Sequence, residues 1–215
     1  MLKKMRRVAQ FAGLDVRRFR DPWAALDRLP EVRTLVDVGV GDNGTPWLWK
    51  RFSGAKLLLV DPLRECRLDP MPPHASFVEA ALGAEERNAT INIAPRVSQS
   101  SLLERTALTH KGAPVEKREV RMRRLDDVVE GEPPFGLKID TEGYELEVLK
   151  GGEDTLAMTR FLIMEVRFRK SFEGSYSFAE VIGFLSERGF AVSAILNPND
   201  RMCDMIFERL SFEGP

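Results

Sequence analysis

Two carboxylates, Asp140 and Glu142, stand directly after a short apolar segment in the second half of the chain. Apolar residues alternate over 135–139, which predicts a buried strand, and the amphipathic pattern beginning at Tyr144 predicts a helix that covers it. Ligands of open α/β sheets bind beyond the carboxyl ends of the strands, so both acids are placed to accept a proton from a reacting group. The alternative is that they only complement the positive N-terminus of the helix.

Three further side chains are candidates for chemistry near these acids. Lys138 lies inside the same strand pattern and needs a carboxylate such as Asp140 or Glu165 as a partner, so a structural ion pair is as reasonable as a substrate contact. Asp140 and Glu165 end what should be adjacent strands, and their oxygens suit a shared magnesium ion. The other interpretation is a general base that works without a metal. His110 titrates in the range of a base, but as a loop residue it has no neighbour to orient it.

A glycine-rich turn supplies the second chemical signal. Gly39, Gly41 and Gly44 form a G-x-G-x-x-G pattern between a predicted strand at 34–40 and a predicted helix at 45–52. Such a turn lets the backbone approach a ligand closely, which both nicotinamide enzymes and S-adenosylmethionine enzymes require. The glycines alone therefore do not choose between these cofactors.

Acidic side chains near the turn discriminate between the two cofactors. Asp37 can receive the ammonium group of a methionine moiety, whereas a pyrophosphate would be repelled by Asp37 and Asp42. Asp61 ends a predicted strand at 56–61, where its carboxylate can accept hydrogen bonds from two ribose hydroxyls. The chain also contains no Tyr-x-x-x-Lys pair of the kind that many nicotinamide enzymes use. These residues favour a positively charged sulfonium cofactor.

The remaining periodicity predicts the elements that position these residues. Strands are predicted at 76–82, 89–94, 118–125 and 161–166, and helices at 21–30 and 178–188. The last two strands, 191–196 and 202–208, are joined by a turn too short for a helical crossover and should pair antiparallel. The sequence thus predicts an α/β, Rossmann-like class I methyltransferase fold, with a mainly parallel sheet that ends in an antiparallel hairpin and a short N-terminal helical segment.

Length and composition indicate one catalytic domain. The 215 residues, 43% of them apolar, can bury one core, which we divide into an N-terminal helical cap at 1–32 and a main domain at 33–215. The net charge of −1 gives no general attraction to nucleic acid. Cys66 and Cys203 match no disulfide framework, and no segment has the pattern of a signal peptide, which predicts a cytoplasmic protein. The basic N-terminus is interpreted as a lid or packing helix with solvated arginines, and the alternative is peripheral membrane contact or contact with an anionic carrier.

Seven motifs follow one another across most of the chain: VDVGVGDNG (36–44), VDP (60–62), FVEAALG (77–83), SQSSLL (98–103), RLDDV (124–128), LKIDTEGYELEVLKGG (137–152) and IMEV (163–166). In this order they resemble the FkbM family of S-adenosylmethionine-dependent O-methyltransferases, and the block at 137–152 is the most specific of them. Two features depart from the family pattern. Asp61 stands where the family often has glutamate, and the helix after Gly44 contains Trp47 and Trp49, which we expect in the core rather than in a pocket.

The resemblance implies a role for each matched position. The residues implied for the methionine and ribose portions of the cofactor are Asp37, Gly39, Gly41, Asn43 and Gly44, with Asp61 and Pro62 at the ribose and Glu79, Ala80 and Ala81 at the adenine edge. Asp140 and Glu142 would face the methyl group. The loop at 98–103 would lie near the substrate.

One activity is expected from these residues, with two alternatives. The expectation is transfer of the methyl group of S-adenosylmethionine to a hydroxyl oxygen of a sugar, glycolipid or secondary metabolite, with magnesium as an optional second cofactor. Self-association of the chain is left open. The alternatives are an NAD(P)-dependent oxidoreductase, which Asp37 disfavours, and a non-catalytic protein that binds an adenosine ligand, which Asp140 and Glu142 disfavour.

Overall fold

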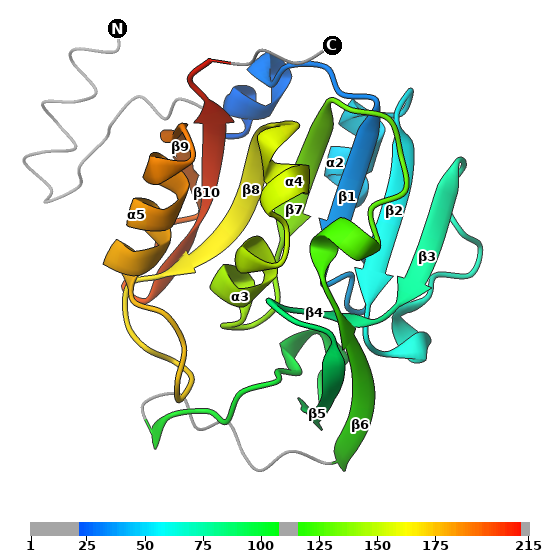
Figure 1. Ribbon diagram of the computed structural model, residues 1–215, viewed down its shortest axis with the longest axis vertical. Helices are drawn as coiled ribbons and strands as arrows, with labels where there is room; N and C mark the ends of the chain where they lie inside the picture. The colour runs from blue at the N-terminus through cyan, green and yellow to red at the C-terminus, as the bar shows by residue number, and fades with distance from the viewer. Residues whose placement is uncertain (1–21, 108–115, 212–215) are drawn as a thin grey trace, which may run out of the picture.

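The computed structural model describes residues 22–107 and 116–211 (Figure 1). The strands are β1 (Thr34–Val38), β2 (Lys56–Asp61), β3 (Ala75–Glu79), β4 (Ala81–Leu82), β5 (Arg87–Ile93), β6 (Glu116–Arg123), β7 (Phe135–Ile139), β8 (Thr159–Arg167), β9 (Phe190–Leu196) and β10 (Met202–Arg209). The helices are α2 (Pro46–Arg51), α3 (Glu145–Lys150), α4 (Glu153–Ala157) and α5 (Phe178–Glu187), with short 3-10 turns η1 (Pro22–Arg28), η2 (Arg64–Cys66), η3 (Val97–Gln99) and η5 (Leu125–Asp127). The basic N-terminal segment at 1–20 and His110 lie outside the described residues.

Seven strands form the main sheet of the described chain, in the order β3-β2-β1-β7-β8-β10-β9. The first five of these pair in parallel, and β10 pairs antiparallel with both β8 and β9. The turn at 197–201 is too short for a crossover, which explains the antiparallel hairpin. The predicted Rossmann-like fold, with its mainly parallel sheet and terminal hairpin, is confirmed.

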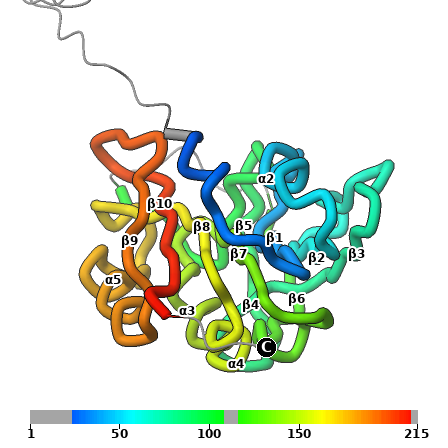
Figure 2. Tube along the Cα trace, turned by 90° about the horizontal axis from the view of Figure 1, so that it is seen from above, coloured from blue at the N-terminus to red at the C-terminus, as the bar shows by residue number. Residues whose placement is uncertain are grey.

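Helices cover both faces of this sheet, as Figure 2 shows, with α2 on one side and α3, α4 and α5 on the other. The central parallel strands are nearly continuous apolar segments because neither face meets water. Successive residues alternate between two cores: Val36 and Val38 pack with α3, α4 and α5, whereas Leu35 packs with α2 and η1. This packing fixes the strands whose carboxyl ends carry the candidate site.

Two predicted elements differ from the structure. The predicted strand at 76–82 is divided, because the chain leaves the main sheet after Glu79 and Ala81–Leu82 pair with β6 in a second sheet of order β4-β6-β5. The predicted helix at 21–30 is a 3-10 turn over Pro22–Arg28, which packs Ala25 and Leu26 against the core beside α2. No helix in the described ranges is both long and apolar enough to cross a membrane.

Candidate active site

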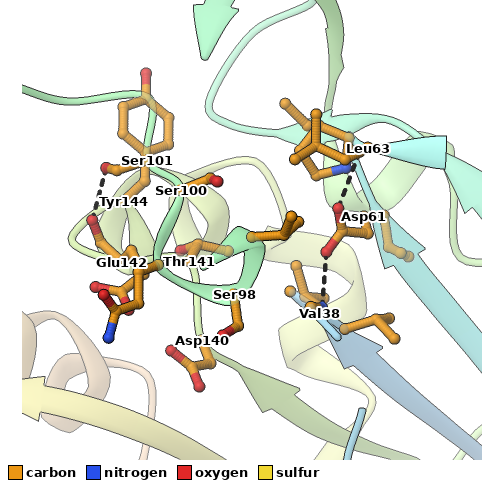
Figure 3. A pocket seen from close by; sticks show the side chains of 18 of the residues that line it. Val38, Asp61, Leu63, Ser98, Ser100, Ser101, Asp140, Thr141, Glu142 and Tyr144 are labelled. Atoms are coloured by element: carbon orange, nitrogen blue, oxygen red, sulfur yellow. Dashed lines mark hydrogen bonds between the residues drawn. The ribbon is translucent and has the colours of Figure 1, made fainter. Parts of the chain in front are cut away.

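A cavity of about 370 Å³ opens at the carboxyl edge of the main sheet, beside the ends of β1, β2 and β7. The strand order reverses between β1 and β7, which is the position where open α/β sheets bind ligands. The cavity is lined by the glycine turn at 38–44, the end of β2 at 60–63, the segment at 96–102 and the acidic turn at 140–142. Figure 3 shows Asp61 on one side of this space and Asp140 and Glu142 on the other.

The glycine turn is shaped by two positions that admit no side chain. Gly39 has a φ of +81°, and a Cβ there would lie 1.8 Å from the carbonyl oxygen of Asp140. Gly41 has a φ of +57°, and its Cβ would lie 2.8 Å from Cβ of Ser98. Glycine is therefore required both for the left-handed backbone and for the close approach of the neighbouring segments.

Asp61 ends β2 at the floor of the cavity with both carboxylate oxygens hydrogen-bonded to backbone. The Gly41 N–H donates to Oδ2 over 3.0 Å, and the Leu63 N–H donates to Oδ1 over 2.9 Å. Burial raises the pKa of Asp61, and the two backbone hydrogen bonds act in the opposite direction. The side chain of Cys66 also hydrogen-bonds to this carboxylate, which is therefore held in one orientation and can accept a hydroxyl group of a ligand.

Asp37, for which a direct ligand contact is predicted, lies behind the wall of the cavity. This side chain is completely buried, and it does not line the cavity. The indole Nε1–H of Trp49 donates to its Oδ2 over 2.8 Å, and the Lys138 ammonium lies 3.6 Å from its Oδ1. Val38 faces the cavity and Asp37 the side of α2, because successive side chains of a strand point to opposite faces. Asp37 therefore anchors Trp49 and Lys138 from behind the glycine turn.

Lys138 connects Asp37 to Asp140. Its Nζ lies 3.4 Å from Oδ2 of Asp140, so the predicted ion pair with Asp140 is confirmed. Burial alone would lower the pKa of Lys138, but the charges of Asp140 and Asp37 outweigh it and raise the pKa. Lys138 therefore stays protonated. It orients the Asp140 carboxylate, which is 37% exposed and borders the cavity.

Glu142 lies in a cluster of buried charges that sequence reasoning missed. Arg167 places Nη2 2.7 Å from Oε2 of Glu142 and 2.5 Å from Oε1 of Glu165, so two carboxylates share one guanidinium. Burial raises the pKa of Glu142 to about 7, although Arg167 opposes the shift. Burial and the charge of Asp140 also raise the pKa of Glu165. One signal was available: Glu165 and Arg167 are two residues apart on a strand and so share a face.

The segment that contains SQSSLL closes one side of the cavity. Ser101 donates its hydroxyl hydrogen bond to the backbone oxygen of Glu142 over 2.8 Å, and Arg105 donates to the backbone oxygen of Gln99 over 2.8 Å. The guanidinium of Arg105 also stacks over the Phe172 ring, with its carbon 4.8 Å from the ring centroid. These contacts hold the segment against the acidic turn, and Glu142 itself has a φ of +52° there.

The other predicted site residues divide into two groups. The first group lines the cavity, and its cofactor contacts stay predictions: Asn43, Gly44, Pro62, Ala80 and Ala81. Glu79 is exposed at the end of β3 and does not line the cavity, because the chain bends into the second sheet after it. Trp47 is 40% exposed rather than in the core, whereas Trp49 is partly buried against it.

The residues do not fit the magnesium site that the sequence suggests for Asp140 and Glu165. The two acids do belong to adjacent strands, although Glu165 lies within β8, two residues before its end, and Asp140 directly follows β7. Glu165 is paired with Arg167, however, and Asp140 with Lys138. Within 22–107 and 116–211, no three His, Cys, Asp or Glu side chains are grouped to hold a metal ion, whereas magnesium needs a near-octahedral set of oxygens.

Comparisons with known proteins place the chain in a family. Solved structures with related architecture include an S-adenosylmethionine-dependent methyltransferase from Aquifex aeolicus (16% identity, TM-score 0.42, covering 87% of this chain and 88% of that one). Another is magnesium protoporphyrin IX methyltransferase from Synechocystis PCC 6803 (10% identity, TM-score 0.43, covering 97% and 90%). A third is an O-methyltransferase family protein from Burkholderia thailandensis (13% identity, TM-score 0.47, covering 98% and 59%). No curated protein matches the sequence. Residues 37–192 match the model of the methyltransferase FkbM domain, and the chain therefore belongs to the FkbM methyltransferase family.

Proposed function

We propose that this protein transfers the methyl group of S-adenosylmethionine to a hydroxyl oxygen of a small molecule or glycan. The observation that carries the proposal is the cavity itself, in which the glycine turn, Asp61 and the acidic turn at 140–142 surround one space at the switch point of the sheet. Its volume of about 370 Å³ falls in the range of small-molecule sites.

The charges around the cavity suit a cationic cofactor better than a dinucleotide. The lining contains five acids, Asp42, Asp61, Asp140, Glu142 and Glu165, against two basic residues, Arg96 and Lys138. Both basic residues are already paired, Arg96 with Asp42 at 3.7 Å and Lys138 with Asp140. Glu142 and Glu165 share the Arg167 guanidinium and burial raises the pKa of both, so the excess of negative charge is smaller than this count of acids. The excess stays negative, so it would repel a pyrophosphate and attract a sulfonium. Asp37 is not one of these five acids, so the charge balance of the cavity does not depend on it.

Each part of the site has a function in this proposal. Asp61 accepts a hydrogen bond from the ribose of the cofactor. The glycine turn, which carries no side chains, lets the backbone approach the cofactor closely. The bound cofactor supplies a methyl group that is already activated by its positive sulfur, so the protein must chiefly align the acceptor and exclude water. Asp140 takes the proton from the acceptor hydroxyl as the oxygen attacks, and Lys138 holds its carboxylate in place.

Calorimetry tests the cofactor assignment without knowledge of the acceptor. Wild-type protein should bind S-adenosylhomocysteine and not NADH, and Asp61→Asn should weaken the binding by about 10-fold or more, because one oriented acceptor for a ribose hydroxyl is lost. Asp69→Asn, at an acid outside the cavity, is the matched control. Binding of NADH in preference to S-adenosylhomocysteine would favour the oxidoreductase alternative instead.

A further inference from the structure

A second hollow adjoins the cofactor cavity on the side of α2. It has a volume of about 240 Å³ and shares Gly44, Lys138, Asp140 and Glu165 with the first cavity. The shared residues lie at the boundary between the two spaces, so a molecule in the second hollow reaches the same Asp140 carboxylate that borders the first. This is the arrangement that a transfer between two bound molecules requires.

The remaining walls of the hollow combine one aromatic surface and the apolar residues Ile163, Met164 and Leu196 with polar groups. Trp47, from the first turn of α2, lines it and is 40% exposed. Asn197 donates its amide hydrogen bond to Oδ2 of Asp204 over 3.2 Å, and both residues line the hollow. Asp204 pairs in register with Glu165 on β8, which brings a third carboxylate beside Asp140 and Glu165. Lys138 is the basic residue among the lining residues.

We infer that this hollow is the acceptor subsite and that it selects a neutral, polyhydroxylated ring, such as an uncharged sugar, over an anionic one. The inference rests on the proposed methyl transfer, and it goes further by naming the subsite and its specificity. An indole presents a flat apolar surface to one face of a ring, and carboxylate and amide groups together offer acceptors and donors to adjacent hydroxyls. Glu165 is already paired with Arg167, so the carboxylates of Asp140 and Asp204 stand against the single ammonium of Lys138. The negative charge that remains repels a carboxylate or phosphate on the acceptor.

Ligand binding in the presence of saturating S-adenosylhomocysteine tests this inference. The probes are methyl glycosides of glucose, galactose, mannose, rhamnose and fucose, together with methyl glucuronide, which keeps the glucose ring and adds one carboxylate. Binding is followed by saturation-transfer NMR and titration on the full chain. At least one neutral glycoside should bind, and it should bind about 10-fold or more tightly than the glucuronide.

Two variants locate the binding in the hollow. Trp47→Ala should weaken binding of the neutral glycoside by about 10-fold. Phe168→Ala removes another exposed aromatic ring, outside both cavities, and should not weaken this binding. Asp204→Asn should reduce the discrimination against the glucuronide, and Asp200→Asn, at an exposed acid on the preceding turn, should leave it unchanged. For each variant, the affinities for the neutral glycoside and for the glucuronide are measured on the same protein preparation.

The outcomes separate this inference from the proposed function. Retained S-adenosylhomocysteine affinity in each variant shows that the fold and the cofactor site are intact. Given that affinity, the inference is overturned if no glycoside of the panel binds, if the glucuronide binds as well as its neutral partner, or if Trp47→Ala changes nothing. Failure of the wild-type protein to bind S-adenosylhomocysteine would instead remove the proposed function on which the inference depends.

Discussion

Replacing Glu142 by glutamine should make the protein more stable at alkaline pH. Burial raises the pKa of this carboxyl from 4.5 to about 7, with partial opposition from Arg167. An acid whose pKa is raised by folding stabilises the native state below its unfolded pKa and loses that contribution as the pH rises through the folded pKa. For Glu142 the loss therefore falls between about pH 4.5 and pH 7. Glutamine is neutral throughout, so it avoids the loss and can still accept a hydrogen bond from Arg167.

The size of the effect follows from the same numbers. At about 1.36 kcal/mol per pKa unit, a rise from 4.5 to about 7 corresponds to about 3.4 kcal/mol. The carboxyl side chain is 15% exposed and borders a solvent-accessible cavity, so we expect about 2 kcal/mol of this to be observed. The free energy of unfolding of Glu142→Gln should then equal that of the wild type near pH 4.5 and exceed it by about 2 kcal/mol at pH 8.

Urea unfolding followed by circular dichroism at several pH values measures this difference. Glu173→Gln, at an exposed position outside the cavity, controls for the loss of one negative charge from the chain and should follow the wild-type curve. Parallel pH profiles for the wild type and Glu142→Gln would show that burial does not govern this carboxyl. A variant less stable than the wild type at pH 8 would also contradict the prediction, since the ion pair with Arg167 would then outweigh the cost of burying the charge.

Four other predictions test separate parts of the site. Gly39→Ala should destabilise the fold by more than about 2 kcal/mol, because its Cβ meets the Asp140 carbonyl, while Gly54→Ala, in open space, should not; equal urea midpoints would contradict this. Trp49→Phe should cost about 1–3 kcal/mol by leaving the buried Asp37 oxygen without its donor, and an unchanged midpoint would remove that role. Asp140→Asn should lower turnover about 100-fold or more with S-adenosylhomocysteine affinity retained, and undiminished turnover would exclude Asp140 as the base. EDTA should leave turnover unchanged, since Arg167 already pairs with Glu165, and loss of activity that magnesium restores would reverse this conclusion.

The sequence predicts those parts of the molecule that depend on local periodicity. The apolar alternation at 135–139 and the acids that follow it identify β7 and the acidic turn, and the spacing of Gly39, Gly41 and Gly44 identifies the turn after β1. The short turn at 197–201 is sufficient to predict the antiparallel hairpin. In each case the determining residues are neighbours in the chain.

Features that depend on contacts distant in sequence could not be predicted. The family resemblance implies a cofactor contact for Glu79, but pairing between β4 and β6, which are distant in the chain, turns the backbone away from the main sheet after this residue. The short distance from Asp37 to Gly39 likewise favours a ligand contact, and only the return of Trp49 on α2 shows that this carboxylate is occupied. The sharing of Arg167 by Glu142 and Glu165 depends on the pairing of β7 with β8.

A crystal structure of the complex with S-adenosylhomocysteine would show both where the cofactor binds and toward which residues its sulfur, and so the methyl group, is directed. We expect the ligand to occupy the cavity at the carboxyl edge of β1, β2 and β7, with its ribose hydroxyls on Asp61 and its sulfur directed toward Asp140 at the boundary with the second hollow. A ligand seated elsewhere, or one whose sulfur points away from Asp140, would contradict the proposed methyl transfer.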